Sequence, residues 1–114
     1  MEANNQVISY PFGAIDSQSK DYAAIVAATI ENQKTIIEIA EMTGNLTLNL
    51  TIAESLNTGA ELLVKLPSDT TARAVTLGTG ITGTAVAGTI SKTKYASFVY
   101  DGTAFVHVAT QQVD

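Results

Sequence analysis

The sequence feature that most constrains the fold is residues 94–110, in which two β-rich segments flank the pair Asp101-Gly102. An Asp-Gly pair between such segments is the strongest short-range signal for a β-hairpin with a two-residue type I′ turn, because that turn needs positive φ at both central residues. Strand periodicity then pairs Phe98 with Phe105 across the hairpin. Both faces of the hairpin are largely apolar, so we expect it to be buried between layers.

The rest of the chain alternates between short strands and turns. Residues 45–52 are the clearest strand, because leucine or isoleucine occupies every second position and asparagine or threonine the positions between. A period of two indicates a half-buried strand with one solvated face. By the same criteria we expect a loop at 15–20, an irregular glycine/threonine stretch at 78–89, a tail at 111–114, and strands at 7–10, 21–29, 34–40, 60–66 and 72–77.

This pattern predicts the fold class. Short strands that recur about every eight to twelve residues are typical of sandwiches and barrels rather than of βαβ units. We therefore expect an all-β fold: a compact antiparallel β-sandwich, jelly-roll-like, or a partly closed barrel, with a C-terminal β-hairpin. A chain of 114 residues has room for one core. We divide it into an N-terminal arm or loop with a short strand, residues 1–20, and a single β-domain, residues 21–114.

Charged side chains are scarce in this sequence. They make up 15% of the residues, against about 25% in ordinary globular domains, and sixteen threonines supply much of the polar surface instead. Two interpretations remain open: copies of the chain or a partner cover part of this neutral exterior, or a rigid β-domain stays soluble on hydroxyl groups alone. The net charge of −5 argues against nucleic-acid or anionic-membrane binding, since both depend on lysine and arginine.

The sequence predicts neither export nor membrane insertion. Its first residues are neither basic nor apolar, so we expect no signal peptide. The longest apolar run, 22–30, is far shorter than the roughly twenty residues that span a bilayer. Cysteine is absent, so no disulfide framework holds the fold. We expect synthesis in the cytoplasm.

Motifs for chemistry are weak. Residues 78–83 match G-x-G-x-x-G, but a dinucleotide fingerprint opens a helix inside a βαβ unit, whereas more glycine and threonine follow here. We interpret the match as a loop or bulged strand between β-elements. His107 is the only histidine. A metal site needs further ligands and a serine triad needs a nucleophile, so we expect a packed side chain that donates a hydrogen bond.

The carboxylates and the glycosylation sequons also have simple interpretations. No pair of acidic residues is marked as catalytic, so we expect solvated surface groups. Asn45 and Asn49 each begin a formal sequon on the solvated face of one strand, and we interpret them as a Thr/Asn ladder. We therefore expect no catalytic, cofactor-binding or metal-binding residues and no enzymatic activity. The dispersed carboxylates are Glu31, Glu38, Glu41, Glu54, Glu61, Asp69 and Asp101.

Four stretches carry a resemblance to a known class of proteins: 44–50 (GNLTLNL), 59–65 (GAELLVK), 72–80 (ARAVTLGTG) and 92–106 (KTKYASFVYDGTAFV). Through them, the chain from about residue 21 onward resembles tailed-phage virion structural proteins, in particular auxiliary (decoration) capsid proteins and head-fibre modules of crAss-like gut phages. The family offers no catalytic residues. Residues 1–20 match nothing in it and are expected to serve as a docking arm.

The resemblance implies a non-enzymatic virion protein on the capsid exterior that stabilises the head, with the major capsid protein and head-fibre proteins as partners. Few charges and exposed strand edges also predict a homo-oligomer, a small ring or a trimer. The alternative function is a head- or tail-fibre module for attachment to host surfaces or glycans. Tyrosine and phenylalanine are available for that role, but tryptophan is absent.

Overall fold

A computed structural model describes residues 15–113, so the expected strand at 7–10 lies outside the described residues. Within this range the chain is all-β, as predicted, with ten strands in two sheets. The strands are β1 (Asp16–Lys20), β2 (Ile25–Ile30), β3 (Lys34–Ile39), β4 (Leu46–Ile52), β5 (Glu61–Pro67), β6 (Ala74–Leu77), β7 (Ile81–Thr82), β8 (Val86–Ala87), β9 (Thr93–Tyr100) and β10 (Phe105–Val113).

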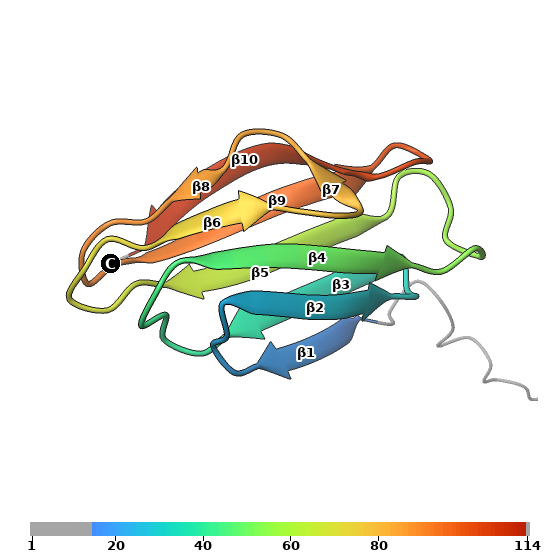
Figure 1. The fold of residues 1–114 in the computed structure, drawn as a ribbon. Coiled ribbons are helices and arrows are strands. Elements are labelled where there is room, and N and C mark those ends of the chain that lie inside the picture. The colour runs from blue at the N-terminus through green and yellow to red at the C-terminus, as the bar shows by residue number, and fades with distance from the viewer. Residues whose placement is uncertain (1–14, 114) are drawn as a thin grey trace, which may run out of the picture.

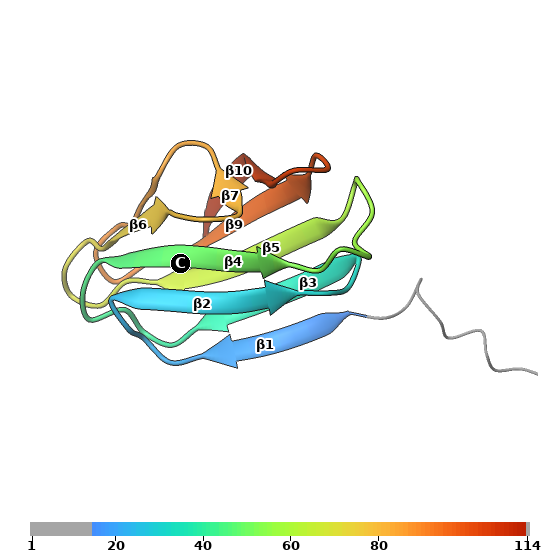
Figure 2. The same cartoon turned by 45° about the vertical axis from the view of Figure 1, so that its right-hand side comes forward.

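The two sheets lie one over the other (Figure 1). Sheet A has six strands in the order β1-β3-β5-β9-β10-β7, and sheet B has four in the order β2-β4-β6-β8. The first six strands alternate between the sheets, and within each sheet these strands pair in parallel. The chain therefore winds as a coil in which each turn adds one strand to each layer, as the rotated view also shows (Figure 2).

The expected antiparallel pairing is wrong for these six strands. Antiparallel pairs occur only later in the described chain, between β5 and β9, β9 and β10, and β6 and β8. The short turn at 31–33 is a crossover between the sheets, because β2 and β3 belong to different layers. A period of two predicts which residues share a face, but it carries no information about the direction of the neighbouring strand. The strand order of both sheets is open-ended, so neither closes into the expected barrel.

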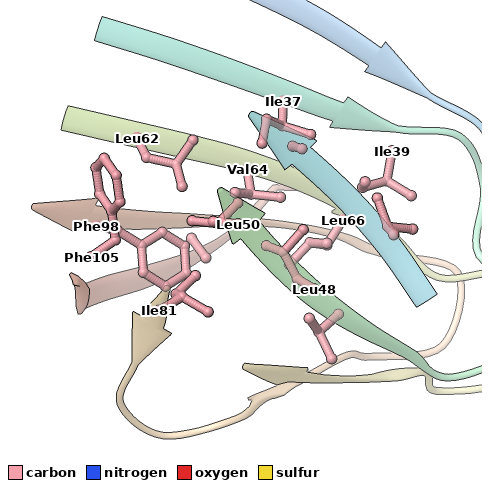
Figure 3. Packing of buried hydrophobic residues seen from close by; sticks show 14 of the residues in the cluster. Ile37, Ile39, Leu48, Leu50, Leu62, Val64, Leu66, Ile81, Phe98 and Phe105 are labelled. Carbon is pink, nitrogen blue, oxygen red and sulfur yellow. The ribbon is translucent and has the colours of Figure 1, made fainter. Parts of the chain in front are cut away.

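The core fills the space between the sheets. The leucines of β4 that alternate with asparagine and threonine are buried, as predicted, at 3% (Leu46), 1% (Leu48) and 5% (Leu50) exposure. They face the inward side chains of β5, among them Leu62 and Leu66, and Phe98 and Phe105 complete the cluster at the hairpin end (Figure 3). Burying a side chain of this size contributes about 1.5–3 kcal/mol, so this seam supplies much of the folding free energy.

Most predicted strands are present, with ends shifted by at most four residues, and three other predicted assignments are wrong. The expected loop at 15–20 is strand β1, the irregular stretch at 78–89 contains β7 and β8, and β10 runs through the expected tail to Val113. β1 was hidden because its sequence, DSQSK, contains no apolar residue. It is recognisable as a strand only from its parallel pairing with β3, from Asp16↔Thr35 to Lys20↔Ile39.

The C-terminal hairpin is present, but its turn is not a two-residue type I′ turn. Tyr100 pairs with Phe105, so residues 101–104 form a four-residue loop, and Phe98 pairs with His107. The Asp101 carboxylate accepts hydrogen bonds from the backbone N–H groups of Ala104 (2.9 Å) and Thr103 (2.8 Å). These bonds hold the pKa of Asp101 below its usual value. Asp therefore acts as a side-chain acceptor in an Asx-type turn, and only Gly102 has positive φ.

β1 closes the open end of the coil with polar side chains. Its residues Asp16, Gln18 and Lys20 are half-buried and align with the core-facing residues of β3. Gln18 Nε2 donates to the Thr29 carbonyl of β2 in the other sheet (3.0 Å) and to Asp16 Oδ2 (2.7 Å). Inward-pointing polar groups on an edge strand oppose the addition of further strands. The first turn of the coil thus acts as a cap.

We expect Gly102→Val to destabilise the protein by about 1–3 kcal/mol, because a β-branched residue is strained at a φ of +102°. A Cβ atom there would also lie 3.1 Å from Thr58 Oγ1. Gly102→Asn is the control and should cost less, since asparagine tolerates positive φ better. Urea unfolding measures both variants. A wild-type unfolding midpoint for Gly102→Val would contradict the loop conformation.

We expect Gln18→Val to lower the free energy of unfolding by about 0.5–1.5 kcal/mol, because it removes the hydrogen bond to the Thr29 carbonyl. It should also increase light scattering on heating, since the edge becomes more apolar. Ser19→Val, on the exposed side of the same strand, is the matched control and should change stability by less than about 0.5 kcal/mol. Equal effects of the two substitutions would show that Gln18 has no capping role.

Candidate functional site

The outer faces of the two sheets differ in chemistry. Sheet B presents mostly alanine, threonine and asparagine outward, with Ile25 as its large exposed hydrophobic residue. Sheet A instead presents large apolar side chains on its outer face, from the residue before the edge strand β1 to β10, with Lys34 and Glu61 among them. The apolar side chains are Ile15, Ile36, Leu63, Val99 and Val108, and we call them the apolar set. An exposed apolar face on one layer alone makes the outer face of sheet A the candidate interaction surface.

The parallel register arranges this face in rows. Ile36 of β3 lies beside Leu63 of β5, and Leu63 lies beside Ser97 of β9. One row away, Lys34 lies beside Glu61, and Glu61 beside Val99. On the other side of the apolar row, Glu38 lies beside Lys65. Outward residues on β3 and β5 thus read Lys-Ile-Glu and Glu-Leu-Lys in the same direction.

A groove of about 350 Å³ runs over this face. The apolar set lines it, together with the side chains of Lys34, Glu61 and Ser97. A β-bulge in β10 interrupts the pairing between His107 and Ala109, and Val108 lies at this bulge. Val108 is 61% exposed and Ile15 55% exposed. The groove is open and apolar, which suits a protein surface better than a charged small molecule.

The expectation that the hairpin is buried on both faces is wrong. Phe98 and Phe105 are fully buried, but Val99 on the opposite face of β9 is 39% exposed. Two layers can cover only one face of each sheet, so the second apolar face of the hairpin remains at the surface. The outward residue Val99 of the hairpin therefore belongs to the apolar set.

Charge on this face comes from one weak ion pair and its neighbours. Lys34 Nζ and Glu61 Oε1 are 3.7 Å apart, with side chains 55% and 62% exposed. Pairs this exposed contribute little to stability because water and salt screen them. They are therefore available to form new pairs with groups on a partner.

Below the groove, on the core side of β3, Thr35 is buried, and its Oγ1 atom has no hydrogen-bond partner within the described residues. A buried hydroxyl without a partner costs free energy. The hydroxyl faces the core rather than the groove, because Thr35 belongs to the inward set of β3. It has no role in the outer surface.

His107 is a packed side chain, as predicted. Its ring lies 5.1 Å from the ring of Phe98, its Nδ1 atom is 3.2 Å from the Thr84 carbonyl oxygen, and its Nε2 atom is 2.7 Å from Thr110 Oγ1. Both nitrogens are thus occupied by local partners. Among residues 15–113, no three His, Asp or Glu side chains gather closely enough to hold a metal ion.

The glycine-rich match at 78–83 packs against β4 and the hairpin. The backbone N–H of Leu50 donates to the Thr79 carbonyl, and that of Phe105 to the Gly80 carbonyl. A side chain at Gly80 would collide with the Leu50 backbone. No helix follows, and the segment contains the short strand β7 between Gly80 and Gly83. Glycine is needed here for close packing, which confirms the interpretation as a β-element connection.

Among the described residues no three of the dispersed carboxylates gather at one site, and one of them, Asp69, makes a bidentate contact. Asp69 accepts two hydrogen bonds from Arg73, at 2.9 Å and 3.0 Å, and Arg73 lowers the pKa of Asp69. This pair stabilises the turn between β5 and β6. Asn45 and Asn49 accept hydrogen bonds from the backbone N–H groups of Ala74 and Thr79, so both amides belong to the ladder predicted for β4.

Comparison with protein-family models and with curated proteins finds no match to this chain. The described chain contains no helix with the length and hydropathy needed to cross a membrane.

The sequence contains a signal for the apolar set that alternation alone does not reveal. β3 contains Ile36 beside Ile37, and β5 contains Leu62 beside Leu63, so adjacent apolar residues point to opposite faces. A strand that is apolar on both faces in a protein with only two layers must expose one of them. Recognising the surface therefore required the number of layers, which the sequence pattern does not provide.

We expect the double substitution Val99→Thr/Val108→Thr to change the free energy of unfolding by less than about 0.5 kcal/mol per site, because both side chains are exposed. It should also shorten retention on a hydrophobic-interaction column. Phe98→Ala is the contrasting variant, and with 1% exposure it should cost about 3–5 kcal/mol. A loss above about 2 kcal/mol for the double variant, measured by urea unfolding, would show that this face is not a free surface.

Proposed function

We propose that this chain is a non-enzymatic structural protein of a phage virion, an auxiliary (decoration) protein on the capsid exterior that stabilises the head. The observation that carries the proposal is the apolar outer face of sheet A, on a domain whose other large apolar residues are mostly packed in the core. A contiguous apolar patch on a small protein marks an interaction surface. The resemblance of residues 21–114 to phage virion proteins supplies the assembly in which that surface acts.

The architecture suits this role. Local turns and a continuous core make a stiff β-domain, and its polar cap on β1 limits uncontrolled edge-to-edge association. The Thr- and Ala-rich outer face of sheet B can lie against another surface with little desolvation of charge. Many copies at equivalent lattice sites make even a weak contact effective, because multivalent binding multiplies the individual affinities.

The stabilising effect would follow from mass action. A protein that binds the closed shell and not its opened form stabilises the shell by RT ln(1 + [L]/Kd) at each site. The proposed partners are the major capsid protein and head-fibre proteins, and the proposed location is the virion exterior.

The test is a phage that lacks this gene. We expect its particles to assemble but to release DNA at lower temperature and after milder osmotic shock than wild type. Adding back the purified protein should restore tolerance, whereas adding back a Val99→Asp/Val108→Asp variant should not. Mutant particles with wild-type tolerance would overturn the proposal. If they also fail to adsorb to host cells, the protein is a fibre module for attachment instead.

A further inference from the structure

Six outward residues on the two adjacent strands β3 and β5 form an ordered array. The register of the parallel pair places them in three rows: Lys34 beside Glu61, Ile36 beside Leu63, and Glu38 beside Lys65. A lysine and a glutamate therefore lie side by side in the first and the third row. Each strand also carries a lysine at one end of its outward set and a glutamate at the other. The apolar row lies between them and opens into the groove.

This array is complementary to itself. Turning it over about a two-fold axis that runs along the strands, midway between β3 and β5, places β3 of one copy over β5 of the other. Lys34 then faces Glu61 of the second copy, and Glu38 faces Lys65. Ile36 faces Leu63 of the second copy in the apolar row. Every charge meets its opposite, and the apolar residues meet each other.

We propose that the outer face of sheet A binds a second copy of this chain, face to face, about this strand-parallel two-fold axis. The neighbouring strands also support this geometry. The same axis places β9 over β1 of the second copy, so Val99 faces Ile15, and Ser97 faces Ser17. The two sheets then pack in the aligned arrangement common for stacked β-sheets, at about 10 Å separation.

The perpendicular two-fold axis fits less well. It also pairs opposite charges, because each strand carries Lys at one end and Glu at the other. However, it places the exposed Ile15 over Ser19 of the second copy, whereas the strand-parallel axis places Ile15 over Val99. The trimer expected from composition would join two different surfaces and would make no use of a self-complementary face.

The size of the face predicts a modest affinity. Four strands overlap about this axis, and at about 4.8 Å spacing and about 20 Å length they give a footprint of roughly 400 Å² per copy, so the dimer buries about 800 Å² in total. This is the size of weak, transient interfaces. We expect a dimer that dissociates on dilution and weakens at high salt, since much of its specificity is electrostatic.

This inference deepens the proposed function on which it rests, because the dimer uses the outer face of sheet A and leaves the outer face of sheet B for the capsid. It is tested on the purified chain, independently of the virion. Sedimentation velocity over a concentration series should show a monomer–dimer equilibrium in the wild type. Glu61→Lys places a second positive charge opposite Lys34 at two points of the dimer and should weaken it by about tenfold or more. Glu54→Lys, an equal charge change in the exposed loop after β4, is the matched control and should leave the dimer intact.

A double swap distinguishes the two axes. Lys34→Glu/Glu61→Lys keeps opposite charges in contact only about the strand-parallel axis, so retained dimerisation supports the proposal. Loss of the dimer in the double swap, with recovery after Glu38→Lys/Lys65→Glu is added, would overturn it in favour of the perpendicular axis. A wild-type monomer at all concentrations, or equal behaviour of Glu61→Lys and Glu54→Lys, would overturn self-association. Thermal melts of each variant verify folding. The experiment on phage particles that lack the protein tests the proposed function independently of these results.

Discussion

The packing of β4 against β5 across the two layers is the interaction on which the rest of the fold depends. Each strand is flanked on both sides within its own sheet, β4 by β2 and β6, and β5 by β3 and β9. Their inward leucines and valine are almost fully buried. The first six strands alternate between the two layers, so each connection between them crosses from one sheet to the other. The next strand must then pack its inward side chains against the same core. The parallel coil is the arrangement that does so with short connections.

A parallel coil leaves a strand edge open at each end, to which a further strand could add. The chain protects the two ends in different ways. At the start, β1 replaces core residues with Asp16, Gln18 and Lys20, which are poor neighbours for another strand. At the other end, β8 and β9 run antiparallel to the last coiled strands, β6 and β5. The hairpin of β9 and β10 then widens sheet A beyond sheet B. A wider sheet A increases the outer area that carries the apolar set.

The sequence predicts the strands of this protein better than their arrangement. Alternation predicted β4 with its buried Leu48 and outward Asn49, because a strand that buries one face has apolar residues at every second position. It failed on β1, whose polar residues are explained by capping and not by a half-buried face. Strand direction and the number of layers depend on contacts between distant segments, which local pattern does not record. For that reason the hairpin's Val99 was expected inside, and the candidate surface was found only from the structure.

The core and the outer face of sheet A share one determinant, the register of β3 on β5. Lys34 and Glu61 lie far apart in the chain and meet only because Thr35 pairs with Leu62 inside the same ladder. A slip of one residue would turn Leu63 into the core and Leu62 outward. A slip of two would preserve the core pattern but place Lys34 beside Leu63, which breaks the alternation of charge. A slip of two residues is therefore visible in the surface array and not in the core pattern, and a partner that binds the array would select the correctly paired coil.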